Sequence, residues 1–227
     1  MVTVLITGAN RGLGLEFTRQ YLAEGASVIA ACRDPGRATA LRALKGALEI
    51  LPLDVGSATS IQALGVALGD RPIDVLLLNA AVHLQKDCTL ASLDAAKWLA
   101  EFEINTVAPV MLARALTENV ANSAGRKIVS ISSGSGSITN LRDGGNYAYR
   151  AGKAATNAAM RMLSHDLAPR GIIVTSIAPG HTRTDMGGDN APYSAEDSVA
   201  RVRGVIARLT LKDSGAFLSR DGTITPW

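Results

Sequence analysis

This sequence has few cysteines, no concentrated charge and no long apolar run, and each absence excludes a class of protein. Only two cysteines are present, Cys32 and Cys88, so neither a disulfide framework nor a multi-cysteine metal site is available. We therefore expect a reducing compartment. No apolar stretch reaches membrane-spanning length, and the chain opens on a strand-like MVTVLITG without a basic segment or cleavage site. These features predict a cytoplasmic protein with no membrane partner.

The charges are nearly balanced and scattered along the chain. Lys and Arg number 23 against 20 Asp and Glu, which gives a formal net charge of +3. Nucleic-acid-binding proteins gather basic residues into a run or stripe, so no nucleic-acid partner is expected here. The small positive excess suits a phosphorylated cofactor. The three histidines, His83, His165 and His181, form no spaced metal set, so we expect no metal and interpret each as a surface or helix residue.

Short apolar runs alternate with longer amphipathic segments. The runs expected as strands are Val2–Ile6, Ser27–Cys32, Leu48–Leu53, Ile73–Leu78, Lys127–Ile131, Ile172–Ile177 and a short last one at Ala216–Leu218. Repeated strand–helix–strand order with right-handed crossovers predicts a Rossmann-type α/β fold, a doubly wound parallel sheet of about seven strands with helices on both faces. The length fits one domain, residues 1–227, and no repeat or linker divides it.

Polar and Gly-rich residues follow the expected strands. Ligands of such sheets bind at the carboxyl ends of the strands, where these segments converge on one edge. They are Gly8–Gly14, Arg33, Asp54, Asn79–Ala81, Ser132–Ser135 and Pro179–Gly188.

The loop TGANRGLG at Thr7–Gly14 joins the first strand to the first helix. Free backbone N–H groups and the helix dipole favour an anion there, and glycines let a pyrophosphate approach the backbone. Phe17 stands where a third glycine of the commoner dinucleotide fingerprint would fall. The alternative is a Gly-rich turn needed only for packing. The candidate cofactor contacts are Gly8, Asn10, Arg11, Gly12, Leu13 and Gly14.

Arg33 lies just beyond the second strand, where dinucleotide folds place an acid for a ribose or an arginine for a 2′-phosphate. With help from Arg11, it predicts NADP(H) as the cofactor. The alternative is a surface arginine paired with Asp34, which would contribute little. At the next strand ends, Asp54 is a candidate acceptor for the adenine amino group and Asn79 a candidate amide support, although either residue type also suits a plain turn.

Tyr149 and Lys153 are four residues apart at the start of an expected helix, so their side chains share one face. A tyrosine is a poor acid–base catalyst at neutral pH unless nearby positive charge favours the phenolate, and Lys153 would supply that charge. The alternative is an ordinary helix surface pair. The pair follows a strand that ends in Ser132-Ser133, whose hydroxyls could bind a carbonyl oxygen.

Together these motifs resemble the short-chain dehydrogenase/reductase family over essentially the whole chain. The residues that carry the resemblance are the TGxxxGxG loop, Asn79-Ala80, Asn105, the Ser-Ser pair, YxxxK and Pro179-Gly180. The family's Asn-Asn-Ala-Gly motif stands here as Leu78-Asn79-Ala80-Ala81, with two departures. The ending DGTITPW at Asp221–Trp227 is similar to the C-factor and sniffer-like carbonyl reductase branch.

The resemblance implies an NADPH-dependent reductase of small-molecule carbonyl compounds. Tyr149 would donate the proton, Lys153 would also grip the nicotinamide ribose, and Asn105 would hold a water beside that lysine. Ser133 would bind the carbonyl oxygen, with Ser135 as a rival and Ser132 as a weaker one. The remaining cofactor contacts implied are Val55, Ala80, Ala81, Pro179, Gly180, Thr182 and Thr184. The hydrolase motif Gly-x-Ser-x-Gly is only partial at Gly134–Ser137, so a hydrolase is disfavoured.

The remaining expectations concern the walls of the site, the oligomeric state and an alternative function. Arg183–Tyr193 is a candidate flap over the substrate and Gly134–Asn146 the opposite wall. The family also implies a homodimer, or alternatively a tetramer, through helices expected at Leu93–Asn119 and Tyr149–Ala168. The Ala-rich face of the second of these helices could instead pack on the chain's own sheet. A dinucleotide-binding signalling or sensor protein of the C-factor type, with incidental redox chemistry, is the alternative function.

Overall fold

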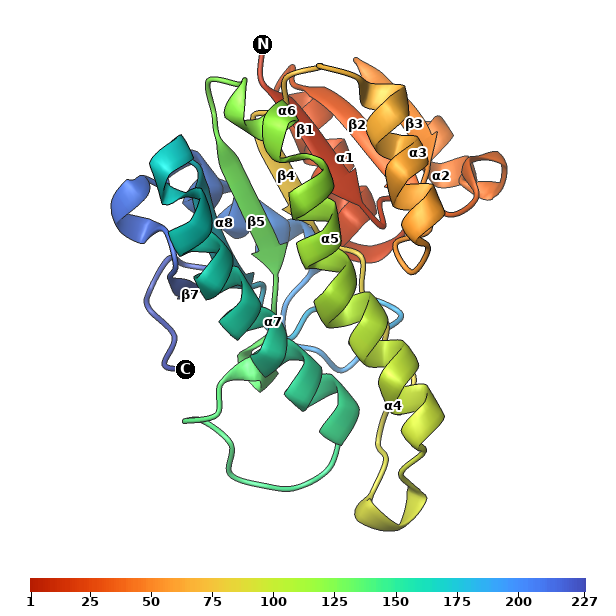
Figure 1. The fold of residues 1–227 in the computed structure, drawn as a ribbon. Coiled ribbons are helices and arrows are strands. Elements are labelled where there is room, and N and C mark those ends of the chain that lie inside the picture. Colours follow the sequence, from red (N-terminus) through yellow and green to blue (C-terminus); the bar gives the residue numbers. More distant parts are fainter.

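Seven parallel strands form one sheet at the centre of the structure, a computed structural model that describes all 227 residues (Figure 1). The strand order is β3-β2-β1-β4-β5-β6-β7. The first three strands are added towards one edge of the sheet and the last four towards the other, so the order reverses between β1 and β4. This order confirms the predicted doubly wound fold. The strands are β1 (Thr3–Thr7), β2 (Ser27–Cys32), β3 (Leu48–Pro52), β4 (Val75–Leu78), β5 (Lys127–Ile131), β6 (Ile173–Ala178) and β7 (Phe217–Ser219).

The apolar runs form strands because both of their faces are covered. Side chains alternate along a strand, so Val4 and Ile6 enter one core cluster with Phe17, while Leu5 enters the other with Leu112. A continuous run of apolar residues therefore buries apolar side chains on both faces of the sheet.

Helices cover the two faces of the sheet (Figure 1). One core cluster joins α1 and α8 to the sheet, and the other joins α3, α5 and α7 to it. The helices are α1 (Gly12–Ala23), α2 (Thr39–Arg42), α3 (Ala58–Leu68), α4 (Ala95–Phe102), α5 (Ala108–Ala115), α6 (Thr117–Ala121), α7 (Tyr147–Leu167) and α8 (Ala195–Arg208).

The helix expected over Leu93–Asn119 is interrupted. Asp94 caps α4 by accepting from the N–H groups of Ala96 and Lys97 at 2.9 and 3.1 Å, which fixes its start. A π-helical turn at Glu103–Val107 then joins α4 to α5. Such turns are rare and frequently lie at functional sites. Asn105, a candidate catalytic residue, lies inside this one.

Other boundaries differ by a few residues. The fourth strand begins at Val75 rather than Ile73, because Ile73 N–H donates to the carbonyl of Asn119 outside the sheet. The helix expected from Tyr149 begins at Tyr147, so the Tyr149–Lys153 pair lies within α7. The last strand is shifted by one residue, to Phe217–Ser219.

The alanine-rich face of α7 is divided between the core and the surface. Ala151 and Ala158 are exposed, whereas Ala154, Ala155 and Ala159 are half-buried. Part of the stripe therefore packs on the chain itself, and part is free to meet another molecule.

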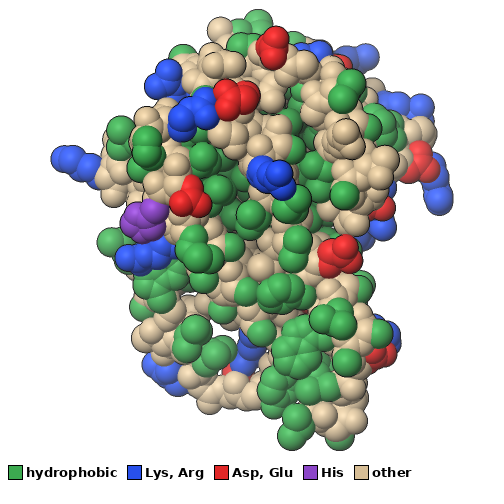
Figure 2. Space-filling model, in the orientation of Figure 1, with side chains coloured by type: hydrophobic (Ala, Val, Ile, Leu, Met, Phe, Trp, Pro, Cys, Tyr) green, Lys and Arg blue, Asp and Glu red, His purple; other side chains and the backbone are tan.

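The surface carries both signs of charge. Figure 2 shows basic and acidic side chains interspersed over this face of the molecule, with apolar groups between them. None of the helices combines the length and the apolar character needed to cross a lipid bilayer.

Candidate functional site

The glycine loop lies between the end of β1 and the start of α1, as predicted. Gly8 and Gly12 have φ values of +66° and +53°, which favour glycine. A Cβ on Gly14 would lie 2.3 Å from the carbonyl oxygen of Gly8 and 2.7 Å from Nδ2 of Asn79. No side chain caps the N-terminus of α1. The loop thus leaves its helix N-terminus open to an anion.

Asn79 holds this loop against the neighbouring strand end. Its Nδ2 donates to the carbonyl oxygens of Thr7 and Gly8 at 2.9 and 3.3 Å. The Thr7 hydroxyl accepts from the N–H groups of Asn79 and Ala80, both at 3.0 Å. The amide nitrogen of Asn79 therefore supports the glycine loop from within the protein.

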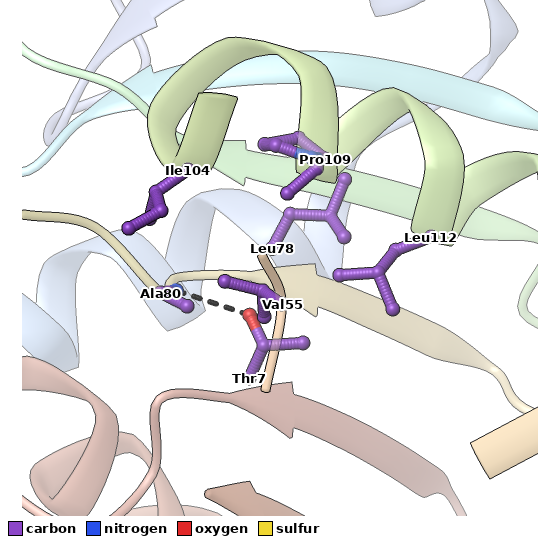
Figure 3. A pocket seen from close by; sticks show the side chains of 8 residues that line it. Thr7, Val55, Leu78, Ala80, Ile104, Pro109 and Leu112 are labelled. Carbon is purple, nitrogen blue, oxygen red and sulfur yellow. Dashed lines mark hydrogen bonds between the residues drawn. The ribbon is translucent and has the colours of Figure 1, made fainter. Parts of the chain in front are cut away.

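A small apolar pocket lies beside these strand ends. Figure 3 shows Val55 with Leu78 and Ile104 around it, and the hydrogen bond from Ala80 to Thr7 at its edge. Val55 therefore lies where the β3 loop meets the π-helical turn. Asp54 is exposed, and its Oδ1 accepts from Gly56 N–H at 3.1 Å, which is a turn contact.

Arg33 is exposed directly after β2 and forms no ion pair. The suggested pairing with Asp34 is wrong, because the Asp34 carboxylate accepts from the backbone N–H of Arg37 at 3.1 Å. The guanidinium of Arg33 is therefore free to bind an anion. Arg11 is exposed as well and forms an ion pair with Asp185 at 3.3 Å.

The segment after β6 folds back on the glycine loop. Thr184 is next to this loop, since a Cβ on Gly12 would lie 3.6 Å from its Cγ2. Thr182 is buried instead, and its hydroxyl contacts the Gly180 carbonyl and the Ser198 hydroxyl at 3.1 and 3.0 Å. Of the two threonines, Thr184 has the more accessible side chain.

Tyr149 and Lys153 are brought together on α7. The Nζ of Lys153 lies 5.8 Å from the centroid of the Tyr149 ring and donates to the carbonyl of Ile131 at 2.9 Å. Burial lowers the pKa of Lys153 to about 8, although the carboxylate of Glu101 acts in the opposite direction. Burial raises the pKa of Tyr149, against the hydrogen bond from Ser133.

The three candidate serines occupy different environments. Ser132 is buried and donates to Oδ1 of Asn157 at 2.6 Å, away from Tyr149. Ser133 is the serine whose hydroxyl acts to lower the pKa of Tyr149, so it lies near the phenol. Its Oγ also accepts from Ser135 N–H at 3.1 Å. Ser132 is thus engaged with Asn157, and Ser133 is the serine that acts on Tyr149.

Asn105 lies between the β4 loop and α7. Its side chain accepts from Val82 N–H at 2.9 Å and donates to the Val82 carbonyl at 2.7 Å. Its own carbonyl accepts from the Thr156 hydroxyl at 2.7 Å. Asn105 thus fixes the loop beside the Tyr–Lys pair.

Two residues of the site were missed by the sequence reasoning. His83 is not a surface or helix residue: it lies half-buried in the β4 loop, and its ring stacks on Tyr149 with centroids 4.5 Å apart and planes at 26°. Glu101 is fully buried and accepts from Leu84 N–H at 3.0 Å. Neither residue belongs to a motif, so the sequence held no signal that singled them out.

A glycine loop at the switch point of a doubly wound sheet, with Ser133, Tyr149 and Lys153 beside it, is the arrangement of a dinucleotide-dependent oxidoreductase. Residues 2–193 match the family described as short chain dehydrogenase. The chain therefore belongs to the short-chain dehydrogenase family.

Two relatives illustrate the sequence similarity. C-signal of Myxococcus xanthus is 39% identical over 154 residues, 68% of this chain and 92% of that protein. The 1-hydroxy-2-glutathionyl-2-methyl-3-butene dehydrogenase of Rhodococcus sp. is 32% identical, and the match covers 100% of both chains.

Solved structures show the same fold. Carbonyl reductase Sniffer of D. melanogaster superimposes with a TM-score of 0.94 at 33% identity, over 100% of both chains. NADPH-bound carbonyl reductase from chicken fatty liver gives a TM-score of 0.92 at 33% identity, covering 99% of this chain and 98% of that one.

Gly14→Ala is expected to weaken NADPH binding at least tenfold, because the added methyl group would meet the backbone of Gly8 and distort the loop. Titration calorimetry with NADPH measures this change. The control is Gly65→Ala within α3, where a Cβ meets nothing within 4 Å. This control should keep its affinity and gain up to ~1 kcal/mol in stability. Equal affinities in the two variants would contradict the placement of the cofactor.

Proposed function

We propose that the protein is an NADPH-dependent reductase that converts a carbonyl group, in an aldehyde, ketone or quinone, to an alcohol. The observation that carries the proposal is the position of Tyr149 at the carboxyl edge of the sheet, with the Lys153 ammonium 5.8 Å from its ring centroid and Ser133 near its hydroxyl. The glycine loop opens on the same edge. The names of the similar structures, a carbonyl reductase and an NADPH-bound carbonyl reductase, support the same chemistry.

The residues present fit NADPH. The backbone of the glycine loop would hold the pyrophosphate, since its close approach to Asn79 leaves no room for side chains there. Arg33, unpaired and exposed, would meet the 2′-phosphate with its planar fork of donors. Thr184 would lie near the nicotinamide, beside Pro179 and Gly180. The bound cofactor supplies the hydride for the reduction.

The protein side chains would orient the substrate and supply the proton. Ser133 donates a hydrogen bond to the carbonyl oxygen, and Tyr149 gives its phenolic proton to that oxygen as the C–H bond forms. The ammonium of Lys153 stabilises the phenolate left on Tyr149. Its bond to the Ile131 carbonyl uses one of its three donors, which leaves two for the cofactor ribose.

The substrate would enter between the segment that precedes α7 and the rest of the site. A pocket of about 200 Å³ lies between that segment and the first turn of α7, lined mainly by polar residues that include Ser135, Asn140 and Arg150. Figure 2 shows the molecule hollowed at its lower left, where Figure 1 places this segment. The Arg150 guanidinium forms an ion pair with Asp143 at 2.8 Å and ties the segment to α7.

A signalling or sensor function is the second candidate, and the similarity to C-signal of Myxococcus xanthus favours it. Assays of NADPH absorbance with a panel of aldehydes, ketones and quinones separate the two functions. Tight NADPH binding without turnover of any compound would favour the signalling protein.

Tyr149→Phe should retain NADPH binding and lose ~10²–10⁴-fold in kcat, because only the ionisable hydroxyl is removed. Steady-state kinetics and calorimetry measure the two quantities. The control is Tyr147→Phe, two residues earlier on α7. The ring centroid of Tyr147 lies 6.4 Å from that of Trp98. The turnover of this control should stay within a few fold of the parent. Activity of Tyr149→Phe at the level of this control would reject the assignment.

Arg33→Ala should reduce kcat/KM for NADPH by about 10–100-fold and leave that for NADH nearly unchanged, because only NADPH carries the 2′-phosphate. The matched control is Arg37→Ala, an exposed arginine of the same loop whose substitution should change neither value. Equal losses for the two cofactors would identify Arg33 as an ordinary surface residue.

We also propose a homodimer through α4–α5 and α7, supported by the exposed apolar side chains Leu99, Val107 and Met111 and by exposed Ala158. Light scattering should give about twice the monomer mass of 23.6 kDa. Ala158→Glu should yield monomer, because it places a charge in the interface, whereas Ala63→Glu on exposed α3 surface should not. A parent that is monomeric at micromolar concentration would end this proposal.

A further inference from the structure

Only two charged side chains are fully buried in this protein, and they have opposite signs. Glu101 is 0% exposed and Lys153 is 4% exposed, while the other buried polar residues are uncharged. Burying a charge is costly unless an opposite charge or hydrogen bonds compensate for it. Two such charges on adjoining elements therefore call for a common explanation.

Glu101 lies on α4, one turn before Asn105, and both side chains reach the β4 loop. Glu101 Oε2 accepts from Leu84 N–H at 3.0 Å, while Asn105 makes both of its hydrogen bonds with Val82. These two anchors flank His83, whose ring stacks on Tyr149. Glu101 thus contributes to the wall behind the tyrosine.

One carboxylate oxygen of Glu101 is left without a partner. Its Oε1 is buried and makes no hydrogen bond. Burial raises the pKa of Glu101, against the backbone N–H groups of Leu84 and Gln85 and the charge of Lys153. The carboxylate therefore depends on these surroundings to stay ionised. Charge attraction acts without direct contact and is screened little in the interior.

Lys153 likewise lacks a direct contact with a group of opposite charge. Its ammonium donates to one neutral carbonyl, that of Ile131, and contacts no carboxylate directly. Helix α4 packs against α7, which carries this lysine. Glu101 is accordingly the acid whose charge acts on Lys153.

We propose that Glu101 is the buried counter-charge of Lys153, a positioning residue that keeps the lysine ammonium charged inside the reduction site. Its role in the reaction rests on the function proposed above, whereas the charge pairing itself does not. The groups that face Lys153 are Tyr149 on its own helix, Glu101 from α4 and the Ile131 carbonyl from β5. His83 faces Tyr149 from the β4 loop, with Lys86 and Asp87 nearby in sequence.

The pairing predicts a direction for the pH dependence. Burial lowers the pKa of Lys153 to about 8 and Glu101 raises it, so removing Glu101 lowers it further. Glu101 also raises the pKa of Tyr149, which would fall as well. Reduction needs both groups protonated, and both changes therefore move the alkaline limb of activity to lower pH.

The kinetic test is the pH profile of kcat/KM for Glu101→Gln, which keeps the shape and the acceptor for Leu84 N–H but removes the charge. Its alkaline limb should move down by about one pH unit, the size typical of a nearby opposite charge. The control is Glu103→Gln, an exposed acid two residues further along the chain, whose limb should not move. An unshifted limb in Glu101→Gln would overturn the role of Glu101 in the reaction.

The second test needs no activity and therefore stands even if the proposed function fails. Lys153→Met leaves the Glu101 carboxylate buried without its counter-charge, so the urea midpoint at pH 7 should fall. Adding Glu101→Gln in that background should recover most of the loss, although Glu101→Gln alone lowers the midpoint. Additive losses in the double variant would overturn the charge pairing, whatever the protein catalyses.

Discussion

The buried ammonium of Lys153 is the interaction on which the candidate site depends. It lies on α7, close to the face of Tyr149, and donates to a carbonyl at the end of β5. Desolvation opposes this charge, so the site holds it with a backbone dipole and with the field of a buried acid. In the proposed reaction, that charge stabilises the phenolate that remains when Tyr149 donates its proton.

The parallel sheet places the other parts of the site around this lysine. Strand order reverses between β1 and β4, so the loops that follow these strands diverge and leave a crevice at their carboxyl ends. The glycine loop occupies one side of it, and Ser133 with α7 occupies the other. Asn79 closes the base by joining the end of β4 to the glycine loop.

The β4 loop connects the cofactor side to the catalytic side. Asn105 and Glu101 hold it from α4 and the π-helical turn, and His83 rests on Tyr149. A π-helical turn adds one residue to a helical turn, which changes the directions of the side chains on either side of it. This local irregularity lets Asn105 meet the loop while α5 continues along the sheet.

Several features followed from the sequence alone, because each depends on local pattern. Continuous apolar runs predicted the strands, the glycine spacing predicted the phosphate loop, and the four-residue spacing of Tyr149 and Lys153 placed them on one helix face. Matching motifs over the whole chain predicted the family. Strand and helix ends differed by one or two residues, since capping and tertiary hydrogen bonds decide them.

Only the tertiary structure decided which distant side chains meet. Sequence spacing left Ser133 and Ser135 as alternatives, and in the folded chain it is the Ser133 hydroxyl that acts on the pKa of Tyr149. His83 and Glu101 belong to no sequence motif, and they join the site because the β4 loop and α4 pack against α7. A charge separated by some fifty residues of chain acts on Lys153 only after folding removes the water between them, because low polarity is a property of the packed interior.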